Sequence, residues 1–235
     1  MENPQVKVNP KATRLLKDGL SKVARGNFKA AIDEFSRVIK LQPEVMDAYL
    51  FRGNAYIDLG EYQRALPDLD YAIQKNPRYG AAYYNRSIAR MALGQADLAL
   101  SDLDEAIRLE PDERGYYLHR SIVHSFREEY EAALEDAEKV IELGDARAGH
   151  NNRAVIFEKM DNLPAAITEW TKALEIDSKN AKAYCRRGIL LAMIGNREGA
   201  IDDLNHGLKY KKELPDPLKE KAENTLQELT GIEQK

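Results

Sequence analysis

Cysteine, tryptophan and histidine are scarce in this chain of 235 residues, which has one cysteine, one tryptophan and four histidines. A single cysteine, Cys185, excludes an intramolecular disulfide framework and a multi-cysteine zinc site. It also fits a reducing compartment, so we expect a cytoplasmic protein. The four histidines lie without a third ligand at metal-binding spacing, and we therefore expect no metal site.

Long apolar segments are also missing. No stretch approaches 18 uninterrupted apolar residues, which excludes a membrane-spanning helix. The opening segment MENPQVKVNPK lacks the apolar core of a secretory signal. The net charge of −4 argues against a binder of nucleic-acid phosphates, and the GxGxxG phosphate loop is absent. We expect no cofactor, no nucleic acid and no membrane partner.

What the chain does contain is an internal repeat. An alanine followed by isoleucine or leucine recurs at intervals of 34, 34, 34, 33 and 34 residues, at Ala31, Ala65, Ala99, Ala133, Ala166 and Ala200. A fixed period of this length is the signature of a repeat architecture. The register places six repeats at 12–45, 46–79, 80–113, 114–146, 147–180 and 181–214.

Each repeat carries two apolar stripes of helical spacing, separated by a break. In the second repeat the first stripe is AYLFRGNAYIDL, residues 48–59, and Gly60 ends it. The second stripe begins at Glu61 and ends at Asn76, because a residue before proline avoids the helical region. The repeat is therefore predicted to be a helix–turn–helix unit that buries its apolar faces only when copies stack.

These residues resemble the tetratricopeptide repeat family. The family's small residue on the first helix is matched at Gly19, Gly53, Ser87, Ser121, Ala154 and Gly188, its large residue by tyrosine in four repeats, and its closing proline in three. The resemblance implies an all-α fold, a right-handed α-solenoid of six helix–turn–helix units. Residues 1–11 are expected to form a flexible head and the start of the first helix, and residues 215–235 a capping helix and tail.

A charged pattern accompanies the repeat. Position 7 is arginine in five repeats, at Arg52, Arg86, Arg120, Arg153 and Arg187. Position 23 is acidic in all six, at Glu34, Asp68, Asp102, Asp136, Glu169 and Asp203. Because the two positions lie on the two helices of a repeat, we predict a structural ladder of arginine–carboxylate pairs. Repeat 1 has Asp18 at position 7, so Glu34 needs another partner.

By the same resemblance, the first helices of the repeats line a concave groove that binds another protein or a peptide. The candidate groove residues are Leu50, Phe51, Asn54, Tyr84, Asn85, Ile88, Leu118, Ile122, Asn151, Asn152, Lys182 and Arg186. The lining of repeats 2 to 4 is mainly apolar, which suits an amphipathic helix or an extended segment. We expect a non-enzymatic interaction scaffold, because no catalytic constellation is apparent.

Two alternatives stay open. The segments YYNRSIARMALG (83–94) and KAYCRRG (182–188) look like repeats of heat-shock co-chaperones, which hold the C-terminal carboxylates of a chaperone. Carried over to repeats 4–6, Asn152, Lys182 and Arg186 match that clamp, whereas Leu118 and Ile122 do not. The other alternative is a homo-oligomerising scaffold, in which the last helix joins two copies instead of capping one.

Overall fold

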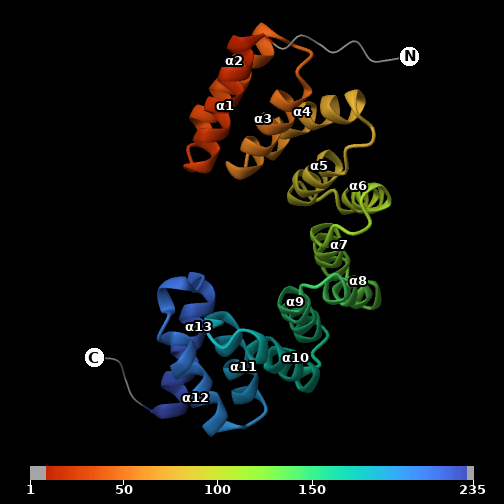
Figure 1. Cartoon of the computed structure of the whole chain (residues 1–235). Coiled ribbons are helices and arrows are strands. Elements are labelled where there is room, and N and C mark those ends of the chain that lie inside the picture. The colour runs from red at the N-terminus through yellow and green to blue at the C-terminus, as the bar shows by residue number, and fades with distance from the viewer. Residues whose placement is uncertain (1–8, 232–235) are drawn as a thin grey trace. The chain divides into compact units, whose positions relative to one another are not determined.

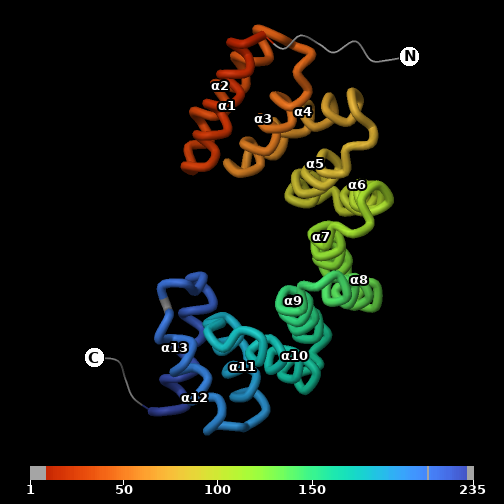
Figure 2. Tube along the Cα trace, viewed as in Figure 1, coloured from red at the N-terminus to blue at the C-terminus, as the bar shows by residue number. Residues whose placement is uncertain are grey.

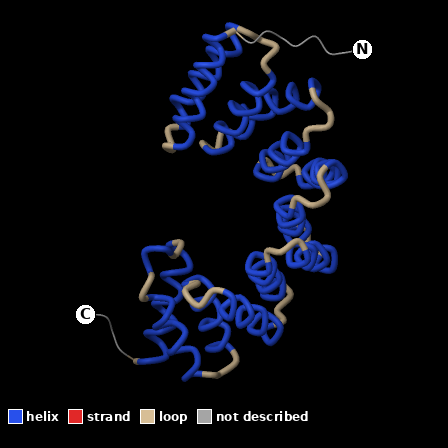
Figure 3. The backbone as a smooth tube through the Cα atoms, viewed as in Figure 1, coloured by secondary structure: helices blue, strands red, loops and turns tan. Residues whose placement is uncertain are grey.

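The structure, a computed structural model, describes residues 9–231, and every regular element in that range is a helix (Figures 1 and 3). This confirms the all-α prediction. The twelve repeat helices are α1 (Pro10–Ala24), α2 (Phe28–Leu41), α3 (Met46–Asp58), α4 (Tyr62–Lys75), α5 (Gly80–Ala92), α6 (Ala96–Leu109), α7 (Arg114–Phe126), α8 (Tyr130–Glu142), α9 (Ala146–Lys159), α10 (Leu163–Ile176), α11 (Ala181–Met193) and α12 (Arg197–Leu208). A 3₁₀ turn (Lys211–Glu213) and α13 (Asp216–Thr230) follow.

The chain divides into two compact units, one ending at Tyr116 and one beginning at Tyr117. In each unit, successive helices pack as antiparallel pairs, such as α5 with α6 and α11 with α12 (Figure 2). The core of each unit consists of alanines at the helix crossings and larger side chains between them. Leu69 fills the first unit and Trp170 the second, and both are fully buried.

The helix ends follow from local hydrogen bonding. Asn9 caps α1 by accepting a bond from the backbone N–H of Lys11 at 2.9 Å, and Pro10 takes the first helical position. Residues 1–8 of the predicted flexible head lie outside the described residues. Several first helices end in a glycine with a left-handed backbone, for example Gly94 with φ of 74°.

Two turns break this glycine rule. Glu128 and Asp161 adopt left-handed backbones, with φ of 64° and 56°, at the position where the other repeats have glycine. Side chains with a Cβ are strained there, although aspartate is more tolerant than glutamate. Pro67 is likewise unusual, because it lies inside α4 on an exposed position.

Helix α13 packs against α11 and α12 (Figure 1). Its Leu218 and Ala222 are buried in a cluster with Cys185 and Leu204 of those two helices. Helices α11 and α12 approach each other closely, since a Cβ on Gly207 of α12 would overlap the sulfur of Cys185 on α11. Within the second unit, α13 therefore covers the apolar face of the last repeat, the arrangement expected of a capping helix.

Candidate functional site

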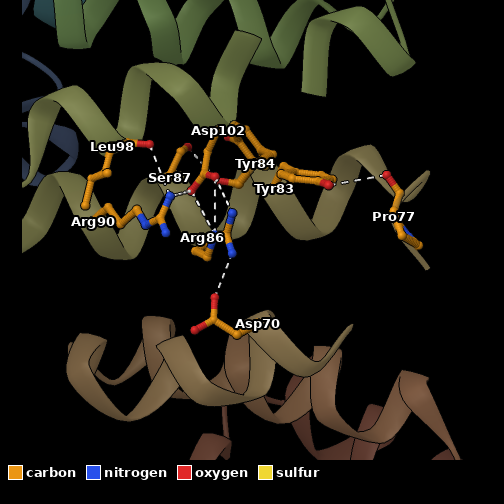
Figure 4. Close-up of polar contacts among 9 residues, drawn as sticks. All are labelled: Asp70, Pro77, Tyr83, Tyr84, Arg86, Ser87, Arg90, Leu98 and Asp102. Carbon is orange, nitrogen blue, oxygen red and sulfur yellow. Dashed lines mark hydrogen bonds and ion pairs between the residues drawn. The ribbon is translucent and has the colours of Figure 1, made fainter. Parts of the chain in front are cut away.

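The charged ladder is best seen in the third repeat, where Arg86 lies between two carboxylates (Figure 4). Its Nη2 donates to Oδ1 of Asp102 at 2.6 Å, and its Nη1 donates to Oδ1 of Asp70 at 2.7 Å. Asp102 is 2% exposed and also pairs with Arg90. Because Asp70 belongs to the preceding repeat, one guanidinium joins two repeats as well as the two helices of its own.

The same geometry recurs and confirms the predicted ladder. The other bidentate pairs join Arg52 to Asp68, Arg120 to Asp136 and Arg187 to Asp203, with distances of 2.7 to 2.9 Å. In each of these repeats a tyrosine at position 4 lies under the guanidinium, at 5.5 to 5.9 Å from its ring centroid. In repeat 1, Glu34 pairs with Lys22 and Arg37 instead.

Repeat 5 departs from this arrangement. Its acid is Glu169, and its nearest basic contact is His150, whose Nδ1 lies 2.7 Å from Oε2. Lys172 donates to the other oxygen at 3.0 Å, whereas Arg153 stays 3.6 Å away and turns toward Glu138. Burial raises the pKa of Glu169, but the bonds from His150 and Lys172 outweigh it and hold that pKa below its usual value.

The candidate groove residues of the first unit differ in accessibility. Leu50 is 2% exposed and packs in the core, so it presents no accessible surface to a partner. Phe51 is partly buried beside Phe35, with ring centroids 5.8 Å apart. Oδ1 of Asn54 is buried, and it has no hydrogen-bond partner among residues 9–231.

The third-repeat candidates Tyr84, Asn85 and Ile88 are all partly buried. The ring of Tyr84 lies 5.1 Å from that of Tyr116, whose hydroxyl donates to Glu110 at 2.7 Å. Burial raises the pKa of Tyr84, and the Glu113 carboxylate adds to the shift. Both phenols therefore stay neutral at physiological pH, and Tyr116, which is 5% exposed, uses its hydroxyl within the protein.

In the second unit, α7 carries the most exposed apolar candidate. Ile122 is 44% exposed and Phe126, one turn further along, is 60% exposed. Residues four apart lie on the same helix face, so the two form one accessible apolar surface. Leu118, a turn earlier, is partly buried.

The asparagines of α9 are used within the second unit. Asn152 donates from Nδ2 to Oγ of Ser121 at 2.6 Å, and that hydroxyl donates to the carbonyl of Ala133. Asn151 accepts a bond from Asn180 at 3.4 Å. Asn152 thus joins repeats 4 and 5, whereas the bond of Asn151 lies within repeat 5.

Arg186 is also engaged. Its Nη1 donates to Oε2 of Glu158 at 2.7 Å, and the other oxygen of Glu158 accepts from the indole N–H of Trp170, also at 2.7 Å. Lys182 lies close enough to Arg186 and Glu158 to interact electrostatically with both. Partial burial and the Arg186 charge lower the pKa of Lys182, and Glu158 offsets part of that shift.

A cavity of about 370 Å³ lies within the second unit, between α13, α11 and the turn after α9. Its lining combines aliphatic side chains with charged groups of both signs: Glu158, Asp161, Leu163, Arg186, Ile189, Leu190, Met193, Pro217, Leu218 and Lys221. Sequence reasoning identified Arg186 here but missed Glu158 as its partner and α13 as a wall. The only feature of the sequence that could have indicated this contact is that Glu158 and Arg186 occupy groove-lining positions of adjacent repeats.

Cys185 is fully buried beside this cavity and does not line it. Burial raises the pKa of its thiol to about 11, and the Asp203 carboxylate contributes. The thiol therefore stays protonated at neutral pH, which makes it a poor nucleophile. In the part of the chain that the structure describes, no three His, Cys, Asp or Glu side chains are grouped to hold a metal ion.

The chain matches repeat-family models along more than half of its length. A model described as tetratricopeptide repeat matches residues 16–78 and 52–114, and one described as TPR repeat matches residues 156–195. Protein DIA2 of Eremothecium gossypii is 35% identical over 63 residues. That match covers 27% of this chain and 9% of DIA2, so the chain spans about a tenth of the curated relative it matches.

Solved structures show the same architecture. The thermophilic TPR protein TTC0263 of Thermus thermophilus aligns with a TM-score of 0.64 and 26% identity, over 77% of this chain and 99% of that one. A tetratricopeptide repeat protein of Parabacteroides merdae aligns with a TM-score of 0.72 over 95% of this chain and 94% of its own, at 17% identity. The second likeness shows the fold alone, an all-α helical repeat solenoid. Among the helices described, none is long and apolar enough to cross a membrane.

Proposed function

This chain belongs to the tetratricopeptide repeat family, and from that premise we propose that it is a non-enzymatic scaffold that binds a partner segment against the first helices of its repeats. Proteins of this fold serve in general as protein–protein interaction scaffolds. The observation that carries the proposal is the apolar surface of Ile122 and Phe126 on α7. Large apolar side chains left accessible on one helix face are typical of interaction surfaces.

The polar groups of the same helices support a protein partner. Asn54 and Asn85 of the first unit are partly buried, and a side-chain amide offers both donors and an acceptor to a peptide backbone.

The co-chaperone alternative has less support. Two of the three residues that match the carboxylate clamp, Asn152 and Arg186, are bonded to Ser121 and Glu158. These bonds occupy one donor of each residue, and Leu118 and Ile122, which fail to match the clamp, supply no donor at all. The homo-oligomer alternative predicts a molar mass above that of one chain in light scattering, and a monomer would remove it.

The scaffold proposal is tested by affinity capture from the source lysate with three proteins. These are the wild type, the double variant Ile122→Ser/Phe126→Ser, and the control Leu98→Ser/Ile176→Ser, which alters two exposed residues of second helices. We expect the wild type and the control to retain a common partner and the α7 variant to lose it by about tenfold or more. A partner that all three retain, or that the control loses equally, would refute binding through the first helices.

A further inference from the structure

The cavity beside α13 has the size and lining of a binding pocket. Its volume of about 370 Å³ lies in the range of small ligand sites. Ile189, Leu190 and Leu218 supply aliphatic walls, and Met193, 59% exposed, stands at its edge. These aliphatic walls offer no hydrogen bonds to water. A large apolar side chain is therefore the preferred occupant of the aliphatic part of the pocket.

The charged lining residues differ in how many of their bonds are already made. Both oxygens of Glu158 accept bonds, from Trp170 and Arg186. Arg186 bonds Glu158 through Nη1, so its Nη2 keeps donors for a ligand. Lys221 on α13 is exposed and forms no ion pair with any described residue.

The charges in and beside the pocket also favour an anionic ligand. Glu158 neutralises Arg186, and the rim carboxylate of Asp161 opposes Lys221. Lys182, whose pKa is lowered by burial and by the nearby Arg186 charge, adds a further cation beside the pair. The four charged lining residues sum to zero, and with Lys182 beside Arg186 and Glu158 the group carries one positive charge more than negative, which complements one anionic group.

We propose that this pocket, built jointly by the last repeat and α13, binds an internal partner segment in which one leucine-sized side chain is followed by a side-chain carboxylate. The apolar side chain lies against Ile189, Leu218 and Met193, and the carboxylate accepts from Lys221 and Arg186. This inference rests on the proposed scaffold function and names the chemistry of the partner. A pair of carboxylates fits less well, because Leu118 and Ile122 supply no donor where the two-carboxylate clamp of the co-chaperones has polar residues.

The test is an NMR titration of the full chain labelled with ¹³C in its methionine methyl groups. Met193 reports on the pocket, and Met46 and Met91 of the first unit serve as internal controls. The probe is the blocked dipeptide acetyl-Leu-Asp-amide, which has a side-chain carboxylate and no terminal one. We expect it to shift the Met193 signal saturably and to leave the two controls unchanged.

Two matched probes separate the parts of the ligand. Acetyl-Leu-Asn-amide removes the charge and acetyl-Ala-Asp-amide removes most of the apolar side chain. We expect each to bind about tenfold more weakly, since a hydrogen bond to a charged group or a buried aliphatic side chain is worth about that factor. Lys221→Glu should weaken acetyl-Leu-Asp-amide by a similar factor.

The control variant is Lys219→Glu, which makes the same charge change on the same helix. Two residues along a helix correspond to a rotation of about 200°, so Lys219 points away from the pocket. We expect its effect to stay within about twofold, as for a remote surface charge.

Three results would overturn the proposal: no Met193 shift with acetyl-Leu-Asp-amide, equal affinity for the Asp and Asn probes, or binding of acetyl-leucine without binding of the dipeptide. The last would assign the anion to a chain terminus. The titration needs no partner protein, so its failure leaves the capture result standing. Conversely, loss of the α7 effect in the capture experiment would leave a positive titration unchanged.

Discussion

Repeat 3 and repeat 5 have the same helix–turn–helix fold but use their charged residues differently. In repeat 3, Arg86 is held by Asp102 and Asp70, over the ring of Tyr83. In repeat 5, histidine replaces the tyrosine and glutamate replaces the aspartate, and the arginine no longer forms the bidentate pair. The bidentate pair thus occurs in the repeats that have tyrosine, arginine and aspartate at these three positions, and we infer that the three residues act together.

Replacing the position-7 arginine with alanine should change the free energy of unfolding by very different amounts in the two repeats, and this is the largest difference that we expect. Arg86→Ala leaves the buried Asp102 with Arg90 alone and should lower the free energy of unfolding by about 3 kcal/mol. Arg153→Ala should cost about 1 kcal/mol, because His150 and Lys172 still hold Glu169. Urea unfolding followed by circular dichroism measures both. Equal costs would show that the two arginines contribute alike.

Acid should reveal the carboxylates that are held ionised. The pKa values of Glu169 and Glu34 are lower in the folded chain than the ordinary glutamate value of 4.5. A lowered folded pKa gives stability that is present above the unfolded pKa and is lost as the pH falls through the folded value. The wild type should therefore lose stability below about pH 4.5.

Glu169→Gln provides the comparison for this pH dependence. It should be less stable than the wild type at pH 7 and should lose less between about pH 5 and pH 3, since it has one such carboxylate fewer. Thermal unfolding at several pH values gives both curves. Parallel curves would mean that Glu169 has the same pKa in the folded and unfolded chain.

Converting repeat 5 to the pattern of repeat 3 tests whether the set acts together. The double variant His150→Tyr/Glu169→Asp should let Arg153 form a bidentate pair, which predicts a favourable coupling of about 1 kcal/mol relative to the two single variants. A double-mutant cycle on unfolding free energies measures the coupling. A value of zero would mean that ring and acid act independently.

The smallest expected effect concerns the turns between the paired helices. Asp161→Gly in repeat 5 should stabilise the chain by about 0.5 kcal/mol, because glycine accepts its φ of 56° without steric strain. Gly94→Asp in repeat 3, with φ of 74°, should destabilise it by a similar or larger amount, about 1 kcal/mol. Paired denaturation curves decide the sign of each change.

The repeats and the ladder were predictable because a period of 34 brings the same residue types to the same place six times. Arg52, Arg86, Arg120 and Arg187 confirm that rule. The contacts of Glu158 with Arg186, and of Asn152 with Ser121, were not predictable, because they occur once and depend on side-chain directions between neighbouring first helices. The turn at Glu128 carries no glycine to mark it.

Burial of Leu50 illustrates the other limit. The residue was selected because its position lines the groove in the family that the sequence resembles. Position 5 is fully covered in repeat 2 and only partly covered in repeat 4, as Leu50 and Leu118 show. How far a neighbouring helix covers it depends on packing that a period in the sequence does not encode.

The arginine that spans two repeats has a consequence for chain length. In the ladder pairs, position 7 contacts position 25 of the preceding repeat, as Arg52 does with Ser36, Arg86 with Asp70 and Arg187 with Thr171. Each of these contacts joins residues 16 apart. Repeat 4, which is one residue shorter, keeps the contact over 15 residues, from Arg153 to Glu138. A gene duplication that inserts one whole repeat therefore supplies each new arginine with an acceptor, because it preserves the spacing between position 25 and position 7.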